Sequence, residues 1–472
     1  MNKRGKRLLF EQEQLHAIFN ASLYRGCVDG ERGYYKVGKQ RPRNARFWVP
    51  LIAPFTGTRL GAICQVATTD VCTIMALSAS VPSRRSLDNN AAPCQIKQTV
   101  VWIAELLLNR ASDMIPIHVG IIGYAPPRSW AAVAHAPAIA SLDGQFVLTG
   151  IANSTAASAQ AAAATLPGVR AFASAAALIE SPDVDLIAIV VKVPHHAELV
   201  RLALAAGKHV LCEWPLARTL DEATELAALA DVAGVVAAVG MQAGHVAAVR
   251  RVRAICEDGK LGPLLSATVV GNGMTWGESI ERHNAYLLDP ANGATMLTIA
   301  VGHALTAIEA VLGPVAEVAA TVATRRTVVT VQETDERIAQ ATADQVLLAC
   351  TTTTGLPVSL HYRGGLPRGL GLTWEIDGVK GSVRVTSPSG LVEMTPLTVE
   401  VRRRGDKTWT VDMPPSDRPA IEGVASIYKS LAEAIAGRAS DVPRFADAAR
   451  LHALIATIER SAATGRRLRV EG

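Results

Sequence analysis

Short apolar segments alternate with alanine-rich stretches from Ile117 onward, and this alternation limits the fold more than any other feature. Four segments predict strands: IHVGIIGY, FVLTGIAN, DLIAIVVKV and HVLCEW, which begin at Ile117, Phe146, Asp185 and His209. A helix such as ELVRLALAAG, closed by a glycine, is expected between strands. Strands that alternate with helices form parallel sheets with crossover helices. The pattern therefore predicts an α/β fold with a doubly wound parallel sheet of the Rossmann type.

A chain of 472 residues is too long for one hydrophobic core and predicts two or three domains. We expect a poorly defined segment over residues 1–113, a nucleotide-binding domain over 114–240 and a second domain over 241–472. C-terminal helices over 420–436 and 444–464 are expected to pack back on the nucleotide-binding half.

The net charge of +5 is unevenly distributed along the chain. Residues 1–113 hold 16 Lys/Arg against 8 Asp/Glu, whereas the remaining residues hold 31 against 34. The main body therefore lacks the basic character of a nucleic-acid-binding surface, and a nucleic-acid partner is not expected there.

The seven cysteines are scattered, and no C-x-x-C pair occurs among them. This pattern suits a reducing cytoplasm and argues against both a disulfide framework and a zinc site, so no metal is expected. No uninterrupted apolar run reaches the ~18 residues of a membrane span. The basic start of the chain has no apolar segment after it, which argues against a secretory signal.

The turn after the first expected strand is a candidate pyrophosphate site. Gly120 and Gly123 form only part of the glycine fingerprint with which dinucleotides approach a backbone. Two prolines without N–H groups lengthen the turn, so Arg128 and neighbouring N–H groups would bind the anion. Ser129 is a suitable N-cap for a helix that begins at Trp130.

The end of the second expected strand is the usual place of the carboxylate that binds the NAD ribose. Asn153 occupies it here. An amide can still bind a ribose hydroxyl, and it does not repel a 2′-phosphate. The cofactor prediction is therefore NAD or NADP.

The string AGKHVLCEWPLA, which ends at Ala217, carries a specific resemblance. With His196, GKLGPLLSATVVGNG from Gly259 and VGHALTAIEAVLG from Val301, it resembles the Gfo/Idh/MocA oxidoreductase family over about residues 117–472, and within it the fungal galactose-regulon repressor branch. The resemblance implies a second α/β domain with a large open, mostly antiparallel sheet that covers the nicotinamide and a sugar- or polyol-like ligand.

The resemblance also implies roles for individual residues. Cofactor contacts are expected from His196, Glu213, Trp214 and Gln242, in addition to Lys192. Further candidates for the pocket wall follow from the second domain: Trp276, His283, Asn284 and Tyr286.

Active members of this family carry E-K-P, whose lysine works with an aspartate and a histidine spaced D-x-x-x-H. Here the lysine position is Trp214, the aspartate position is Ile299, and only His303 remains. An indole N–H cannot exchange its proton near neutral pH. Trp214 could stack on a ligand, or it could be an aromatic plug at the domain junction. Lys192, at the carboxyl end of an expected strand, is a second catalytic candidate beside His303.

Three functions remain open for residues 117–472, and DNA binding through residues 1–73 is a fourth. The first is an NAD(P)-binding protein with a carbohydrate-like ligand and altered or lost turnover. The second is a non-enzymatic regulator that senses cofactor or sugar and contacts another protein. The third is an active sugar oxidoreductase that uses Lys192 or His303. The resemblance also implies a possible homodimer through the C-terminal sheet.

Residues 8–73 show a different resemblance, to a fragment of the tyrosine recombinase (phage integrase) catalytic domain. The arginine that binds the scissile phosphate in that family would be Arg59, but Ala62 replaces a usual glutamate. The other catalytic residues of the family do not follow. Since several cations are needed for phosphotransfer, we interpret the segment as an inactive remnant.

Overall fold

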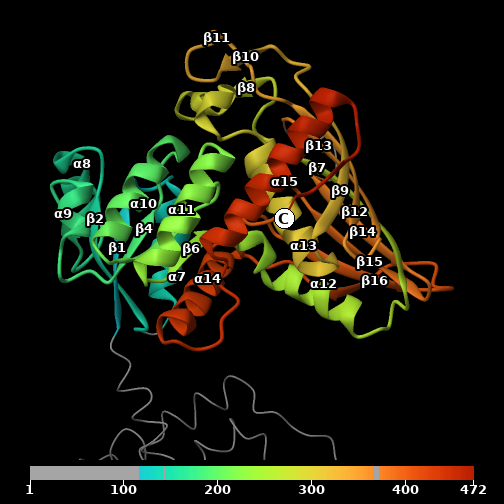
Figure 1. Ribbon diagram of the computed structural model, residues 1–472, viewed down its shortest axis with the longest axis horizontal. Helices are drawn as coiled ribbons and strands as arrows, with labels where there is room; N and C mark the ends of the chain where they lie inside the picture. Colours follow the sequence, from blue (N-terminus) through green and yellow to red (C-terminus); the bar gives the residue numbers. More distant parts are fainter. Residues whose placement is uncertain (1–115, 143, 366–370, 472) are drawn as a thin grey trace, which may run out of the picture. The chain divides into compact units, whose positions relative to one another are not determined.

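The computed structural model describes residues 116–142, 144–365 and 371–471. The predictions for residues 1–113, including the recombinase resemblance and Arg59, lie outside the described residues. The described part forms one compact unit built on two main sheets (Figure 1).

The first sheet has six parallel strands in the order β3-β2-β1-β4-β5-β6. Its strands are β1 Ile117–Ile122, β2 Phe146–Ala152, β3 Arg170–Ala171, β4 Leu186–Ile189, β5 His209–Glu213 and β6 Ala237–Gly240. This is the strand order of a dinucleotide-binding Rossmann fold. The parallel sheet predicted from the alternation is confirmed.

Both faces of this sheet are buried, which explains why its strands are apolar almost without interruption. On β1, Ile121 packs into one core with Leu186 and Leu211, whereas Ile122 packs into the other core with Ile187. The covering helices are η1 Ala131–His135, α7 Ala136–Ala140, α8 Ala156–Ala163, α9 Ala175–Ile179, α10 His196–Ala205 and α11 Leu220–Ala233.

One predicted strand is shorter than expected. The segment Asp185–Val193 was expected to be extended throughout, but β4 ends at Ile189 and a short 3-10 helix, η2, spans Val193–His195. Pro194 lies inside that helix, and a proline cannot donate a hydrogen bond to a sheet. The early end of β4 leaves Val190 and Val191 free to line a cavity.

The second sheet has nine strands in the order β17-β16-β15-β14-β7-β13-β12-β9-β18. The strands are β7 Leu264–Asn272, β9 Val315–Ala323, β12 Gln345–Thr352, β13 Pro357–Arg363, β14 Leu372–Gly378, β15 Gly381–Ser387, β16 Thr398–Arg403, β17 Thr410–Met413 and β18 Leu468–Arg469. Only β7 and β13 pair in parallel. The large, mostly antiparallel sheet expected from the family resemblance is confirmed.

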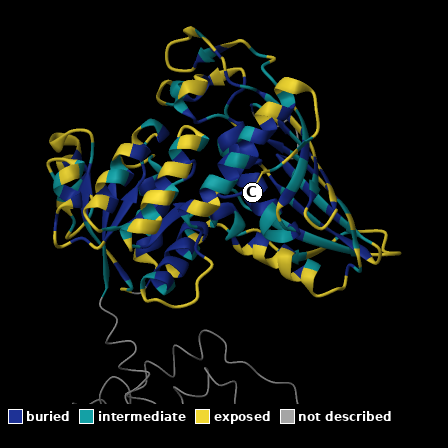
Figure 2. Ribbon diagram, in the orientation of Figure 1, coloured by how far each residue is buried: buried dark blue, intermediate teal, exposed yellow. Residues whose placement is uncertain are grey.

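Helices cover one face of the nine-stranded sheet, as the buried residues in Figure 2 show. They are α12 Ala247–Glu257, which contacts β16, α13 Gly302–Leu312, which packs on α12, and α15 Phe445–Thr464, which contacts β9. A third, small sheet of β8 Ser279–Ile280, β10 Val328–Val331 and β11 Arg337–Ala339 was not predicted.

The C-terminal helices return to the Rossmann half, as predicted. Helix α14 Pro419–Ile435 contacts η1 and α7, and α15 contacts α11 of the Rossmann half as well as β9 of the large sheet. In Figure 1 both helices lie between the two sheets. Within the described residues, no helix combines the length and apolar character needed to cross a membrane.

Candidate dinucleotide and ligand site

A cavity of about 240 Å³ opens where the carboxyl ends of β4 and β5 meet the helices of the second half. This is the edge at which ligands bind in open parallel sheets. Seven of the predicted residues line it: Trp130, His196, Glu213, Trp214, Gln242, Tyr286 and His303. The other predicted residues, namely Gly120, Gly123, Arg128, Ser129, Asn153 and Lys192, do not belong to its wall.

The two glycines of the first turn are required by close packing. Gly123 has φ of +101°, and a Cβ there would lie 2.3 Å from the carbonyl oxygen of Val190. A Cβ at Gly120 would lie 3.0 Å from the side chain of Leu178. The glycines therefore let β1 approach its neighbours, which is a sufficient reason for their presence besides pyrophosphate binding.

Ser129 begins the helix that follows this turn, as predicted. Its Oγ accepts hydrogen bonds from the backbone N–H of Ala132 at 3.3 Å and of Ala125 at 2.9 Å. Arg128 is exposed, and its guanidinium has no ion pair or hydrogen bond to the described chain. Arg128 is thus free to bind an anion at the turn.

Asn153 connects the ends of two strands. Its Oδ1 accepts from the N–H of Tyr124 at 2.9 Å, and its Nδ2 donates to the carbonyl of Tyr124 at 2.8 Å. The amide therefore holds the first turn against β2. One N–H of Nδ2 is left for a ribose hydroxyl.

Trp214 occupies the position of the lysine in E-K-P enzymes. Its side chain is 5% exposed, its Nε1–H donates to the carbonyl of Thr298 at 2.7 Å, and its ring packs on His452 at 4.7 Å between centroids. A Cβ on Gly302 would lie 2.8 Å from Nε1. Because the only polar atom of the indole already has a buried partner, these contacts favour the aromatic plug over a stacking platform.

His303 and Ile299 both face the cavity. A π-helical turn, η6 Leu297–Val301, precedes α13, so the simple α-helical spacing assumed for the pair is replaced by a wider turn. π-helical turns occur often at functional sites. His303 is 4% exposed and its Nδ1 has no hydrogen-bond partner.

Glu213 belongs to a buried network of hydrogen bonds. Its carboxylate accepts from Nε2 of Gln242 at 2.9 Å and contacts Nε2 of His135 at 2.9 Å. Nδ1 of His135 lies 3.0 Å from the hydroxyl of Tyr428. Since a carboxylate only accepts, Nε2 of a neutral His135 carries the proton and the Tyr428 hydroxyl donates to Nδ1.

This network joins four residues from four separate elements of the chain, and it was not predicted. His135 is fully buried on η1, and Tyr428 is fully buried on α14. No local pattern around either residue indicates the contact.

His196 is held by the backbone on both sides of its ring. Its Nδ1 lies 2.9 Å from the carbonyl oxygen of Pro215, and its Nε2 lies 2.9 Å from that of Val191. Burial lowers the pKa of His196. The residue therefore joins the ends of β4 and β5, and its ring presents one edge of the cavity wall.

Lys192 lies beside the cavity. Its side chain is exposed, and Nζ is 4.4 Å from the ring centroid of Tyr286, which is part of the wall. The remaining candidates Trp276, His283 and Asn284 are not in the wall. Trp276 is buried and donates to the carbonyl of Leu287, and His283 pairs with Glu281.

Glu393 is the wall residue that sequence reasoning missed. It follows β15 in a loop, is 5% exposed, and leaves its Oε2 without a hydrogen-bond partner. Burial raises the pKa of Glu393, and His303 opposes that effect. A glutamate in the loop between β15 and β16 carries no local signal of burial in the sequence.

Four wall residues leave a buried polar atom unpaired: Nε1 of Trp130, Oε1 of Gln242, Nδ1 of His303 and Oε2 of Glu393. Unpaired buried polar atoms are rare because each costs about 1–3 kcal/mol. Donors and acceptors that converge on one cavity, at the carboxyl edge of a Rossmann sheet, fit the nicotinamide end of a dinucleotide beside a hydroxyl-bearing ligand.

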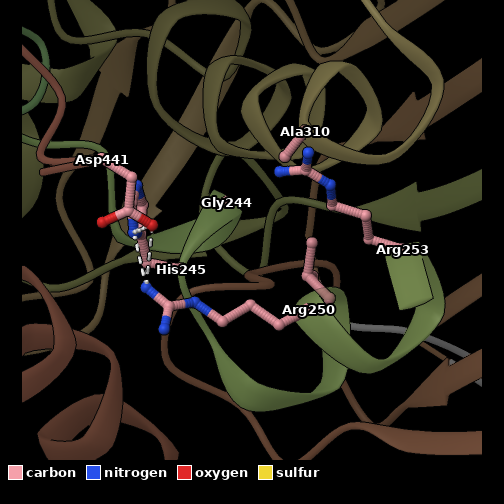
Figure 3. Close-up of a pocket in the computed structure, with 7 residues that line it drawn as sticks. Gly244, His245, Arg250, Arg253, Ala310 and Asp441 are labelled. Atoms are coloured by element: carbon pink, nitrogen blue, oxygen red, sulfur yellow. Dashed lines mark hydrogen bonds and ion pairs between the residues drawn. The ribbon is translucent and has the colours of Figure 1, made fainter. Parts of the chain in front are cut away.

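A second cavity, of about 320 Å³, lies between η3 Gln242–Gly244, α12 and α13 (Figure 3). Its charged groups already have partners. Arg250 pairs with Asp441 at 3.4 Å and contacts Nδ1 of His245 at 3.1 Å, and Arg253 pairs with Glu257 at 2.8 Å. This cavity offers no uncompensated charge to a ligand.

Two family models match the described chain. Residues 117–241 match the oxidoreductase family with an NAD-binding Rossmann fold, Gfo/Idh/MocA, and residues 247–387 match the C-terminal domain of Gal80p. The Rossmann half is therefore similar to Gfo/Idh/MocA oxidoreductases, and the second half is similar to the C-terminal domain of Gal80p.

Known proteins of two kinds resemble this chain. It is 27% identical over 307 residues to the galactose/lactose metabolism regulatory protein GAL80 of Kluyveromyces lactis. This alignment covers 60% of this chain and 66% of that protein. It is 29% identical over 276 residues to dehydrogenase aclE of Aspergillus oryzae, which covers 57% and 75% respectively.

Solved structures share the fold. A super-repressor mutant of Gal80p from Saccharomyces cerevisiae superposes with a TM-score of 0.70 at 23% identity, covering 75% of this chain and 98% of that chain. Levoglucosan dehydrogenase in complex with NADH and levoglucosan superposes with a TM-score of 0.64 at 20% identity, covering 76% and 100%.

Proposed function

We propose that this protein binds a nicotinamide dinucleotide beside a carbohydrate-like ligand, and that it lacks the lysine-dependent turnover of E-K-P enzymes. The observation that carries the proposal is the hydrogen bond from Nε1 of Trp214 to the carbonyl of Thr298 at 2.7 Å. It keeps the lysine position filled by a group that exchanges no proton near neutral pH.

Several contacts support a hydroxyl-rich ligand. The unpaired atoms of Gln242, His303 and Glu393 offer both hydrogen-bond donors and acceptors to the same cavity. Levoglucosan dehydrogenase, which shares the fold, has been solved with a sugar derivative and NADH. At 20% identity, this likeness supports a class of ligand and does not identify one sugar.

When bound, the dinucleotide would supply a hydride acceptor or donor. The residues that would hold it are Arg128 at the first turn, Asn153 at the end of β2, and the wall residues Trp130 and Glu213. Among the described wall residues, His303 is the candidate for moving a proton at the ligand hydroxyl. Loss of a positioned lysine costs ~10²–10⁴ in rate, so we expect any turnover to be slow.

The experiment is calorimetry of the full chain with NAD⁺ and with NADP⁺, followed by NADH absorbance across a panel of sugars and polyols. We expect heat with at least one dinucleotide and slow or no change in absorbance. The comparison of the two dinucleotides also decides the phosphate preference. No heat with either would contradict the proposal.

A second candidate is a regulator that contacts another protein. It is supported by the likeness of residues 247–387 to the Gal80p C-terminal domain and by the regulatory relatives. Under this proposal, dinucleotide or sugar binding changes affinity for a protein partner without turnover. Partner capture that depends on the added dinucleotide would support it, and equal capture with and without dinucleotide would argue against it.

A third candidate is an active oxidoreductase that uses Lys192 or His303. The position of Lys192 beside Tyr286, at 4.4 Å, supports its access to the rim of the cavity. Turnover lost in Lys192→Ala but kept in His303→Ala would assign the proton transfer to Lys192. The opposite result would assign it to His303.

Three further proposals concern the domain boundaries, the oligomeric state and the cellular location. We propose domain boundaries at 113/114 and 240/241, and the end of β6 at Gly240 supports the second. A homodimer through the nine-stranded sheet is supported by exposed apolar side chains such as Leu265 and Leu347 on its strands, and light scattering would test it. The cytoplasmic location inferred from the cysteine pattern stays a prediction.

A further inference from the structure

Glu393 and His303 reach the same cavity from different elements of the chain. Glu393 lies in the loop between β15 and β16, and His303 lies in the first turn of α13. Both are more than nine-tenths buried, both line the cavity, and each leaves one polar atom unpaired. No hydrogen bond joins them in the structure. Catalytic hydrogen bonds are often long without substrate and shorten when it binds.

The other ionisable groups near Glu393 already have partners. The charge of Glu213, at the end of β5, raises the pKa of Glu393, and Glu213 itself is hydrogen-bonded to His135 and Gln242. Tyr362 on β13 donates its hydroxyl proton to the carbonyl of Gly390 at 2.9 Å. His303 is therefore the group of potentially opposite charge with which Glu393 can pair.

We propose that Glu393 is the positioning residue for His303, and that it supplies from the β15–β16 loop the carboxylate that Ile299 does not supply from the helix. The inference rests on the proposed function and deepens it. With an oxidised nicotinamide dinucleotide bound, a ligand C–H bond would break and its hydride, with both electrons, would pass to that cofactor. The ligand O–H bond breaks as the carbonyl forms, and the proton passes to a ring nitrogen of His303. Ionised Glu393 stabilises the resulting imidazolium.

The test is an NMR titration of the His303 ring in the full chain, with histidine labelling and with His303→Ala to assign the signal. A carboxylate near an imidazole favours the imidazolium, so Glu393→Gln should lower the midpoint measured for the His303 ring. Glu393→Asp, which keeps the charge, should retain part of the effect. Glu180→Gln, an exposed glutamate of the Rossmann half, should leave the midpoint unchanged.

A rescue variant sharpens the test. Adding Ile299→Asp to Glu393→Gln restores a carboxylate in the same cavity and should raise the His303 midpoint again. An unchanged midpoint in Glu393→Gln overturns the proposal. If Glu393→Gln does not fold, carboxyl signals of the wild-type chain serve instead. Paired groups titrate in shared steps, and independent titration of Glu393 and His303 would overturn the proposal.

The readout needs no dinucleotide, so its failure is distinct from a failure of the proposed function. Calorimetry with NAD⁺ tests that function separately. If the chain turns over, Glu393→Gln should lower kcat by ~10-fold or more with little effect on KM, and should shift the pH profile in the same direction as the His303 midpoint.

Discussion

Trp214 shows how one side chain can replace a functional group by a structural one. Its ring fills the space between the end of β5 and the start of α13, and its only polar atom is hydrogen-bonded to the carbonyl of Thr298. A lysine there would place an ammonium group in a wall to which the helix contributes Ile299 in place of a carboxylate. Substitution of Trp214 by lysine alone is therefore not expected to restore fast turnover.

Trp214→Phe isolates the hydrogen bond of the indole. The phenyl ring keeps most of the apolar contact, but the buried carbonyl of Thr298 loses its donor. We expect the free energy of unfolding to fall by about 1–3 kcal/mol, measured by chemical denaturation. The matched control is Trp409→Phe, because Trp409 lies near the surface between Arg384 and Arg402. Equal losses in both variants would contradict the structural role of Nε1.

At the scale of elements, two π-helical turns flank the cavity. One is η1, which follows Trp130, and the other is η6, which precedes His303. The extra residue in such a turn changes the direction of the side chains that follow it. His303, which follows η6, lines the cavity, and so does Trp130, which immediately precedes η1.

Gly302→Ala tests the junction between η6 and α13. A methyl group at this position would lie 2.8 Å from Nε1 of Trp214, which cannot move without losing its bond to Thr298. We expect a lower midpoint of thermal unfolding and an altered near-ultraviolet circular dichroism signal of tryptophan, although alanine favours helix more than glycine by about 1 kcal/mol. A stabilised variant with an unchanged signal would show that Trp214 can move freely.

The elements of the Rossmann half could be predicted because each strand is a short apolar run between helices, and such runs need no distant partner to be visible. The small sheet of β8, β10 and β11 could not be predicted from the sequence. Its strands are two to four residues long, and β8 pairs with β10 across a long stretch of chain. The wall residues divide in the same way. His303 and Trp214 followed from a family pattern, whereas Glu393 is buried only through packing of distant segments.

At the scale of the whole molecule, the buried His452 and the partly buried His245 should make stability depend on pH. Burial lowers the pKa of both His245 and His452 to about 4. In the unfolded chain each titrates near 6.5. Between these values the unfolded chain binds protons that the folded chain does not, so stability is full above about 6.5 and falls as pH decreases toward 4.

Across this window, protonation of the two histidines in the unfolded chain should lower the free energy of unfolding by several kcal/mol, on the order of 3 kcal/mol for each histidine. The measurement is denaturant unfolding of the full chain at a series of pH values from 7 to 4.5. His452→Leu should flatten the decline, since it removes one of the protonation sites. A decline with the same slope in this variant would show that His452 is already protonated when folded.

Dinucleotide binding should also stabilise the whole unit, because the candidate site takes its walls from both halves. Free NAD⁺ at 100 times its Kd should add about 2.7 kcal/mol to the free energy of unfolding. The rise in melting temperature with NAD⁺ concentration measures this effect. Adenine alone serves as the control ligand, and an equal rise with adenine would place the binding energy outside the nicotinamide end.

The return of α14 and α15 to the Rossmann half has a consequence for how the molecule comes apart. The polypeptide leaves that half at β6 and rejoins it near its C-terminus, where α14 rests on η1 and α7. A protease that cuts a surface loop of the large sheet would leave two fragments. Each fragment would contain elements that pack in the Rossmann half and elements that pack in the large-sheet half. Such fragments should migrate together in a native gel and separate only under denaturing conditions.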